Sequence, residues 1–151
     1  MSLPIFIDAS VPIYAAGRSH PLKEPCAKIV RLIAERPEMF FTDAEVLQEL
    51  LHRYLALRLW EQGKEVLESF ATLMHERIEP VRAADVESAA ALADRNPSSG
   101  PSARNLLHAS VISRVGARRV ISADRGFLRL PQIELLDPKD FEAWNTRLEK
   151  S

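Results

Sequence analysis

The sequence is poor in the features that mark secreted and membrane proteins. Its only cysteine is Cys26, so no disulfide can form within the chain, and a reducing compartment suits it. The apolar start at residues 3–7 is far shorter than the hydrophobic region of a signal peptide and has no basic segment before it. No later apolar run approaches the length of a membrane span. We therefore expect a soluble, cytoplasmic protein.

The sequence also lacks the motifs of several enzyme classes. No Gly-x-Ser-x-Gly occurs, and Cys26 has no histidine signal nearby, which disfavours hydrolases that use a serine or cysteine nucleophile. A phosphatase of the haloacid dehalogenase type needs a second aspartate where this chain has Ser10. A receiver domain needs an acidic pair before its aspartate and a later strand-end lysine, and the chain has neither in the expected place.

Positive charge is unevenly distributed along the chain. The formal net charge is −1 over 151 residues, which argues against an obligate basic nucleic-acid binder. Residues 1–50 and 51–100 each carry a net charge of −2, whereas residues 101–151 carry +3. Between positions 104 and 129, six arginines surround a single acid, Asp124. This segment can meet phosphates, but solvated helix and loop positions also explain the arginines on charge alone.

Apolar patterning predicts one α/β domain. We expect it over residues 3–148, with short tails at 1–2 and 149–151. Apolar runs predict strands at 3–7, 39–41, 119–122 and 133–136. Helices are predicted from Ser10 and over 22–35, 44–60, 64–76, 83–95, 102–115 and 139–148, with a loop at 96–101. Strands separated by helices indicate a parallel sheet wrapped by helices.

Capping residues support several of these boundaries. Asp43 follows the second strand and can cap the helix that begins at Ala44. Ser102 can cap the helix after the loop, and Gly116 can end it.

Aspartates stand at the predicted carboxyl ends of two strands. Asp8 follows the first strand, and Asp124 follows the strand at 119–122. Such an aspartate, taken alone, is more often a cap for the next helix than a catalyst. In a parallel sheet, however, the carboxyl ends of the strands form the ligand crevice, so the two carboxylates can converge. They would repel unless a cation or a proton lay between them, and a metal is the economical explanation.

Glu49 adds a third carboxylate. It lies in an apolar stretch of the predicted long helix, where its side chain cannot easily avoid the buried side, and carboxylates are seldom buried without a partner. The alternative is an exposed position paired with Arg53 one turn later. Glu45, one turn earlier, is a weaker member of the same face. Asp8, Glu49 and Asp124 are the predicted ligands of a divalent metal.

Four short segments, in order along the chain, carry a family pattern. They are FIDAS at 6–10, LQEL at 47–50, SARNLLHA at 102–109 and ISADRGF at 121–127. Together they span nearly the whole chain and resemble the PIN-domain family, particularly the toxin ribonucleases of bacterial VapBC toxin–antitoxin pairs. The resemblance implies a PIN-like three-layer α/β/α fold with a short central parallel sheet. It also implies hydrolysis of RNA phosphodiester bonds by metal-activated water.

The resemblance assigns roles to particular residues. Acids at the positions of Asp8, Glu49 and Asp124 bind magnesium or manganese in that family, with the residue at Ser122 hydrogen-bonding near the metal. A fourth acid, usually aspartate, opens the helix after the loop, and here this position is Asn105. Asparagine keeps the shape and one oxygen acceptor but removes a charge and cannot accept a proton from water. We therefore expect weakened, metal-fastidious or absent cleavage. A purely structural reason for a polar residue in the first helical turn stays open.

Further residues complete the sequence-based hypothesis. Arg104 and Arg125 are the predicted RNA contacts. His108 is a tempting general base, but the resemblance gives it no catalytic part, and a packed or capping histidine is the simpler interpretation. Trp60 and Trp144 are assigned to the core or an interface.

Two functions of different classes remain at this point. The first is an Mg²⁺- or Mn²⁺-dependent endoribonuclease that, by resemblance, meets a small antitoxin and forms a homodimer. The second is a PIN-like module that has lost catalysis and binds RNA or a protein partner.

Overall fold

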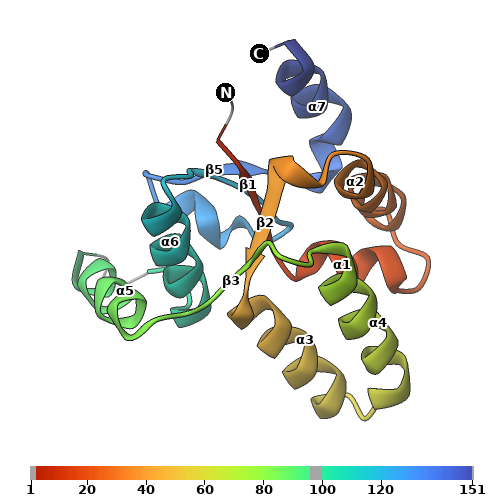
Figure 1. The fold of residues 1–151 in the computed structure, drawn as a ribbon, viewed down its shortest axis with the longest axis horizontal. Coiled ribbons are helices and arrows are strands. Elements are labelled where there is room, and N and C mark those ends of the chain that lie inside the picture. Colours follow the sequence, from red (N-terminus) through yellow and green to blue (C-terminus); the bar gives the residue numbers. More distant parts are fainter. Residues whose placement is uncertain (1–2, 96–99, 151) are drawn as a thin grey trace.

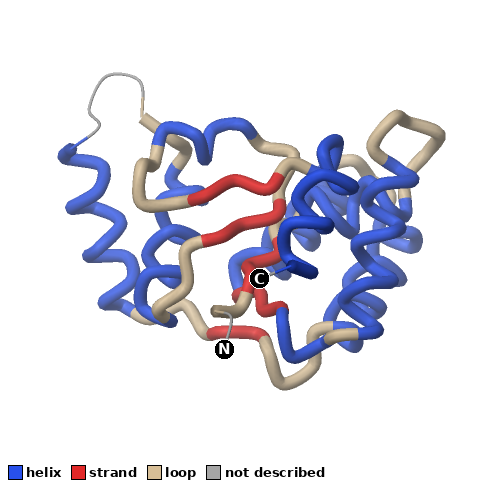
Figure 2. Tube along the Cα trace, turned by 90° about the horizontal axis from the view of Figure 1, so that it is seen from above, coloured by secondary structure: helices blue, strands red, loops and turns tan. Residues whose placement is uncertain are grey.

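Five short parallel strands form the centre of the protein (Figures 1 and 2). The computed structural model describes residues 3–95 and 100–150. The order across the sheet is β3-β2-β1-β4-β5, and every neighbouring pair is parallel. The strands are β1 (Ile5–Ile7), β2 (Phe40–Asp43), β3 (Ile78–Glu79), β4 (Arg119–Ile121) and β5 (Glu134–Leu136). Every residue of β1 and β2 is buried, as expected for a sheet that is covered on both faces.

Helices cover both faces of this sheet. In Figure 1 the α5–α6 pair lies on one side, and α1, α2 and α4 lie on the other. The helices are α1 (Ser10–Ala16), α2 (Lys23–Glu35), α3 (Ala44–Ala56), α4 (Trp60–Leu73), α5 (Ala83–Arg95), α6 (Ala103–Val115) and α7 (Phe141–Lys150). Short 3-10 turns are η1 (Pro37–Met39), η2 (Arg125–Arg129) and η3 (Pro138–Asp140). This arrangement confirms the predicted α/β fold with a central parallel sheet.

Aromatic side chains fill the space between the sheet and the helices. Phe6 and Phe127 are fully buried, and Phe6 meets Phe41 edge-on with ring centroids 5.4 Å apart. Trp144 is 2% exposed, and its Nε1 donates to the carbonyl of Asp137 at 2.8 Å, so it belongs to the core as predicted. No helix within the described ranges is long and apolar enough to cross a membrane.

The predicted caps are confirmed. The Asp43 carboxylate accepts a hydrogen bond from the backbone N–H of Val46 at 3.0 Å and so begins α3. Ser102 Oγ accepts from the N–H of Asn105 at 3.2 Å at the start of α6. Gly116 ends α6 with φ of 85°, in the left-handed region that favours glycine.

The predicted boundary between the third and fourth helices was wrong. α3 ends at Ala56 rather than at position 60, and α4 begins at Trp60 rather than at position 64 and ends before position 76. Arg58 between them has φ of 59°, and the N–H of Leu59 donates to the carbonyl of Tyr54 at 2.9 Å, so the chain turns here. No glycine, proline or asparagine marks this turn, and apolar helical spacing runs through it.

Other differences are smaller. β3 was not predicted, because two half-buried residues are too short to show a strand pattern. β2 extends to Asp43, and α7 extends to Lys150, past the predicted ends at 41 and 148. Residues 96–99 of the predicted loop, the predicted tail at 1–2 and residue 151 lie outside the described residues.

Parallel pairing brings the carboxyl ends of β1, β2 and β4 to one edge of the sheet. Ile7 is aligned with Ile121, and the N–H of Asp8 donates to the Ile121 carbonyl at 3.1 Å. On the other side, Thr42 Oγ1 donates to the Ile7 carbonyl at 2.8 Å. Side chains at the ends of these three strands therefore emerge next to one another.

Candidate metal centre

Asp8 lies at the centre of the site and is only 5% exposed. Its Oδ2 accepts hydrogen bonds from Ser122 Oγ at 2.5 Å and from Ser10 Oγ at 3.4 Å. Burial raises the pKa of Asp8 above its usual 3.8, while His108 opposes the rise, Glu49 adds to it and the Ser122 hydrogen bond opposes it. The balance is a raised pKa, so the charged form of Asp8 is poorly compensated within the chain.

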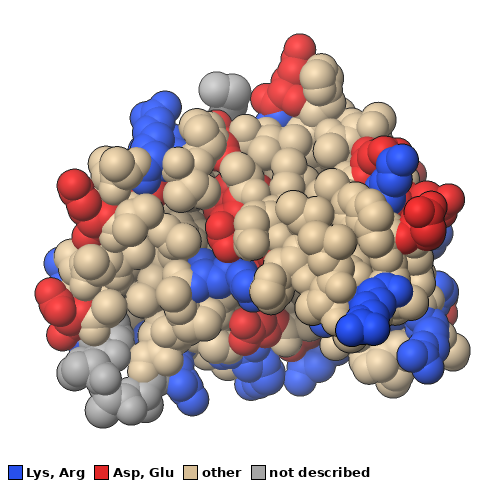
Figure 3. Space-filling view, turned by 90° about the horizontal axis from the view of Figure 1, so that it is seen from below, with Lys and Arg blue, Asp and Glu red and all other residues tan. Residues whose placement is uncertain are grey.

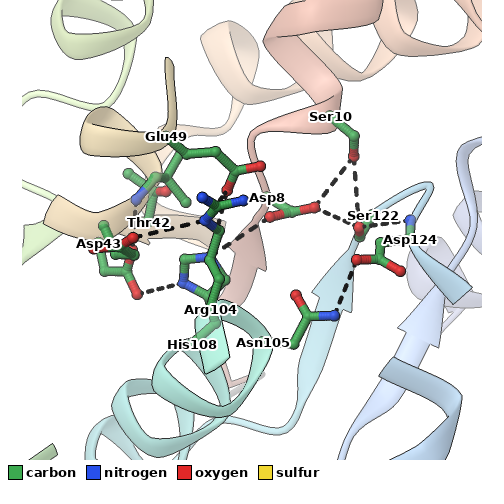
Figure 4. Close-up of polar contacts among 12 residues, drawn as sticks. Asp8, Ser10, Thr42, Asp43, Glu49, Arg104, Asn105, His108, Ser122 and Asp124 are labelled. Carbon is green, nitrogen blue, oxygen red and sulfur yellow. Dashed lines mark hydrogen bonds and ion pairs between the residues drawn. The ribbon is translucent and has the colours of Figure 1, made fainter. Parts of the chain in front are cut away.

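His108 is completely buried among carboxylates (Figure 4). Its Nδ1 lies 2.8 Å from Asp43 Oδ2, and its Nε2 lies 3.8 Å from Asp8 Oδ1 and 3.9 Å from Glu49 Oε1. Burial by itself lowers the pKa of His108, but the hydrogen bond to Asp43, the nearby Glu49 carboxylate and the charges of Asp43 and Asp8 outweigh it and raise the pKa to about 10. The imidazole is therefore positively charged at neutral pH, with Nδ1 donating to Asp43.

Arg104 brings a second positive charge to the same cluster. Its Nε lies 3.5 Å from Glu49 Oε1 and 3.6 Å from Glu45 Oε1. The predicted alternative for Glu49 was an ion pair with Arg53, but Glu49 pairs with Arg104 and His108 instead. Glu45 joins the site through Arg104, which agrees with its predicted place on the same helix face.

Three buried polar atoms in this cluster have no hydrogen-bond partner within the part of the chain that is described. They are Glu49 Oε1, Arg104 Nε and His108 Nε2. Buried polar groups in folded proteins are almost always hydrogen-bonded, so an unsatisfied group of this kind indicates a missing ligand, ion or water. The convergence of three such atoms makes this cluster the candidate binding site.

The donor atoms fit a hard divalent cation. Asp8 and Glu49 each offer one carboxylate oxygen, and these two atoms and His108 Nε2 lie within 4.8 Å of one another. Mg²⁺ commonly uses one or two carboxylates together with water and phosphate oxygens, and Asp8 and Glu49 supply this pair. His108 holds protons on both ring nitrogens while charged, so it acts as a counter-ion to the carboxylates.

Asp124 lies beside Asp8 and is more exposed. Its Oδ2 accepts from Asn105 Nδ2 at 3.0 Å, its Oδ1 accepts from the N–H of Gly126 at 2.8 Å, and its own N–H donates to Ser122 Oγ at 2.9 Å. Ser122 thus links Asp124 to Asp8. Asp124 is not a member of the tight group formed by Asp8, Glu49 and His108 among the described residues, although it lines the same cleft.

The carboxylates open onto a cleft of about 230 Å³. Figure 3 shows the molecule from below, with acidic and basic side chains close together near the middle of this face. The cleft is lined by Asp8, Ser10, Ile13, Tyr14, Glu49, Arg53, Ala123 and Asp124. All three predicted metal ligands therefore reach one concave surface.

The two predicted RNA contacts, Arg104 and Arg125, lie at different distances from the cleft. Arg104 packs onto Glu45 and Glu49 beside the cleft. The side chain of Arg125 is 63% exposed and lies 3.6 Å from Asp137, and it does not line the cleft.

Asp43 and His108 are members of the cluster that sequence reasoning missed. Asp43 was predicted only as a helix cap, a role that its Oδ1 fills, while its Oδ2 contacts His108. A signal was available, because Asp43 ends an apolar strand just as Asp8 follows one. His108 was interpreted as packed, and it is: its ring lies against Phe6 and Phe127, while its nitrogens face Asp43, Asp8 and Glu49.

Known proteins share both the sequence pattern and the fold. The model of the PIN domain family matches residues 5–133. The chain belongs to the PIN-domain family. Ribonuclease VapC13 of Mycobacterium tuberculosis is 34% identical over 132 residues, which cover 87% of this chain and 98% of that protein. Ribonuclease VapC23 of the same species is 38% identical over 122 residues, which cover 80% of this chain and 92% of that protein.

Solved structures confirm the predicted PIN-like architecture. DNA-bound VapBC from Salmonella typhimurium superposes with a TM-score of 0.69 at 18% identity, covering 91% of this chain and 99% of that chain. VapC20 from Mycobacterium tuberculosis, a toxin that cleaves the sarcin-ricin loop, gives 0.67 at 20% identity, covering 82% and 92%. At these identities the likeness concerns the fold alone.

Proposed function

We propose that this PIN-domain protein is an Mg²⁺- or Mn²⁺-dependent endoribonuclease and the toxin of a toxin–antitoxin pair that acts in the cytoplasm. One observation carries the proposal: unsatisfied buried atoms converge around Asp8 and Glu49, at the carboxyl edge of the sheet. Identity of 34–38% to VapC ribonucleases over most of the chain supports the same activity.

Asp8 and Glu49 would hold the cation, with Asp124 as a third acid in the cleft. A bound divalent cation supplies an activated water and stabilises the charge that develops on the phosphate. Ser122 and Ser10 orient the Asp8 carboxylate through hydrogen bonds to Oδ2, which leaves Oδ1 facing Glu49 and His108. The role of these two serines is therefore to position a ligand.

His108 acts as a counter-ion rather than as the general base. Without a bound metal ion, its pKa of about 10 keeps it protonated at neutral pH. Asp43 fixes the ring through Nδ1, so that Nε2 points toward Asp8 and Glu49. Its charge holds the carboxylates together when no cation is bound.

Asn105 weakens the proposed activity. Its Nδ2 donates to Asp124 at 3.0 Å, so it occupies one oxygen of an acid in the cleft without adding charge. Asp8, Glu49 and Asp124 carry a formal charge of −3, where a fourth acid would make it −4. We propose one cation rather than two, with slow cleavage or a requirement for Mn²⁺.

Arg104 and Arg125, the RNA contacts predicted from the sequence, would bind phosphates of the RNA. Arg104 neutralises Glu49 in the structure described here, and a cation on Glu49 would release its guanidinium toward an RNA phosphate. Arg125 is exposed enough to exchange its pairing with Asp137 for a phosphate.

A cognate antitoxin and a second copy of the chain are the proposed protein partners. An apolar groove of about 410 Å³ supports the first. It is lined by Pro12, Ala15, Ala16, Val30, Gln62, Glu65, Val66, Ser69, Phe70 and Leu73 of α1, α2 and α4. Similar solved structures include VapBC from Rickettsia felis and FitAB, each bound to DNA.

Cleavage of single-stranded RNA in Mn²⁺, Mg²⁺ and EDTA tests the activity. We expect cleavage with Mn²⁺, none in EDTA, and a loss of roughly 100-fold or more in Asp8→Asn and Glu49→Gln, since even residues that only support metal ligands contribute about 10- to 100-fold. Glu87→Gln, an exposed acid on α5, is the matched control and keeps the parental rate. Equal rates in Glu49→Gln and Glu87→Gln would contradict the proposal.

A second function, a PIN-like module that binds RNA or a protein without cleaving, is favoured by the positive side chains that already face the carboxylates. His108 and Arg104 place two positive charges against the carboxylates, and Asn105 removes a fourth acid. Absence of Mg²⁺ or Mn²⁺ binding by calorimetry, with unchanged RNA affinity in Asp8→Ala, would establish this function in place of the nuclease.

A further inference from the structure

Without a bound metal ion, the two predicted RNA contacts, Arg104 and Arg125, do not offset the negative charge of the cleft. Three carboxylates line it, and an RNA strand brings further negative charge, so binding needs a cation on the cleft wall. Arg104 is paired with Glu45 and Glu49, and Arg125 pairs with Asp137 outside the cleft. Among the described residues that line the cleft, the basic side chain is Arg53.

Arg53 is placed to receive a phosphate. It is exposed on α3, one helical turn after Glu49, and it makes none of the ion pairs found within the described ranges. Glu49 is its obvious partner by spacing, but that carboxylate turns toward Arg104 and His108. The guanidinium is planar and offers a fork of donors that matches two phosphate oxygens at once.

Tyr14 supplies an aromatic surface in the same cleft. It lies on α1, is half-buried, and packs against His20 with ring centroids 4.7 Å apart and an interplanar angle of 37°. His20 is itself held, because its Nδ1 accepts from the N–H of Leu22 at 3.0 Å. A ring that is already restrained loses little further freedom when a base stacks on it.

We propose that Arg53 and Tyr14 form a nucleotide subsite beside the carboxylates, in which Arg53 binds a backbone phosphate next to the scissile one and Tyr14 stacks on the adjoining base. Proteins hold single strands with this combination of a cation and an aromatic face, largely without reading the sequence. The volume of about 230 Å³ lies below the roughly 300–1,000 Å³ of pockets that enclose a free ligand. The cleft therefore suits part of a strand that continues into solvent.

The subsite rests on the proposed function in taking RNA as the ligand, but it does not depend on cleavage. Fluorescence anisotropy of a labelled single-stranded RNA, in EDTA and over a series of salt concentrations, measures it directly. We expect Arg53→Gln to weaken binding about tenfold and to reduce the slope of log affinity against log salt by about 0.7. Arg31→Gln, an exposed arginine on α2 outside the cleft, is the matched control and leaves both values unchanged.

Two substitutions separate stacking from other roles of Tyr14. Tyr14→Phe keeps the ring and retains RNA affinity, whereas Tyr14→Leu loses it about tenfold, as expected for one stacked base. Thermal unfolding of both variants by circular dichroism identifies any loss of fold. Mn²⁺ affinity does not fall in Arg53→Gln, because Arg53 offers no metal ligand and its removal takes a positive charge away from the carboxylates.

The outcomes distinguish this subsite from the nuclease proposal. RNA binding that depends on Arg53 and Tyr14 in a protein that never cleaves would support the subsite and overturn the nuclease. Cleavage with parental RNA affinity in Arg53→Gln and Tyr14→Leu would overturn the subsite alone. A chain that binds no RNA would overturn both.

Discussion

Asp8 and Asp85 are both buried, at 5% and 2% exposure, yet their surroundings are opposite in kind. Asp85 accepts from Arg114 Nε at 2.9 Å, from Arg114 Nη2 at 3.1 Å and from the N–H of Arg82 at 2.8 Å. Burial pushes the pKa of Asp85 upward, but the hydrogen bonds from Arg114 and Arg82 and their charges outweigh it and lower the pKa below 3.8. At Asp8 burial prevails, and the pKa is raised.

The difference separates a structural ion pair from a functional cluster. In the Asp85 network, Arg114 also donates to Glu79 and to the Pro80 carbonyl. These hydrogen bonds connect α5 to α6 and to the end of β3. The Asp8 cluster leaves donors and an acceptor without partners. Buried polar groups without partners are common in active sites, because a bound ligand supplies the missing interactions.

The pH dependence of stability should give the largest contrast between the two regions. The pKa of His108 is about 10 in the folded protein against the usual 6.5, so the folded state holds a proton that the unfolded state releases. The unfolding free energy, measured by urea denaturation in EDTA, should be highest below pH 6.5 and fall toward pH 10, by up to about 1.4 kcal/mol per pH unit.

Two variants show which residue causes the loss of stability at alkaline pH and which causes the loss at acid pH. His108→Gln should flatten the fall between pH 6.5 and about 10. Asp85→Asn should act at acid pH instead, because a lowered pKa contributes stability that is lost as pH falls below 3.8. If the unfolding free energy of His108→Gln falls as steeply between pH 6.5 and about 10 as that of the parent, His108 is not charged in the folded protein.

Breaking the satisfied network should reduce stability without touching metal binding. Asp85→Ala leaves Arg114 partly buried, at 22% side-chain exposure, without its main partner. We expect a loss of about 3 kcal/mol in the unfolding free energy, in the range for broken buried ion pairs. Glu79→Ala, which removes the more exposed partner at 35%, should lose less than about 1 kcal/mol. Similar losses in both variants would show that Asp85 is not the anchor.

Asn105→Asp should make the carboxylate cluster around Asp8 differ even more from the Asp85 ion pair, because it adds a further negative charge. The amide that donates to Asp124 becomes a carboxylate that repels it, so the variant should be less stable in EDTA and regain stability when Mn²⁺ is added. We expect RNA cleavage with Mn²⁺ to rise about tenfold, equivalent to roughly 1.4 kcal/mol in the barrier. An unchanged rate from a fully active parent would show that Asn105 does not limit the activity.

Gly126→Ala should have the smallest effect. A Cβ at this position would lie 3.0 Å from Asp124 Oδ1 and 3.1 Å from Asn105 Nδ2, so these two side chains must shift slightly. We expect a stability loss of about 1 kcal/mol and a modest fall in Mn²⁺ affinity, measured by calorimetry. Gly17→Ala, where the nearest atom is a backbone carbonyl remote from the carboxylates, controls for the loss of a glycine.

Much of the architecture follows from local sequence patterns. The apolar runs that became β1 and β4 end beside acids, and the rule that parallel strands share a carboxyl edge was enough to bring Asp8 and Asp124 to one cleft. The burial argument for Glu49 also predicted its inward position. Each of these inferences used only the local sequence around one acid.

The remainder depends on contacts that no local pattern reveals. His108 meets Asp43 across 65 residues, and Arg104 turns onto Glu45 and Glu49 instead of standing free as a surface arginine. The turn at Arg58 carries no glycine or proline, so apolar spacing alone extended the helix too far. In each case packing between distant elements decided the outcome.

Mn²⁺ titration calorimetry on the parent, Asp8→Asn and Asp85→Asn tests the central claim most directly. Both substitutions remove one buried aspartate charge, and only the first lies in the unsatisfied cluster. We predict one Mn²⁺ per chain for the parent and for Asp85→Asn, and no measurable binding for Asp8→Asn. Equal Mn²⁺ binding by the parent and Asp8→Asn would contradict the assignment of a metal centre to these carboxylates.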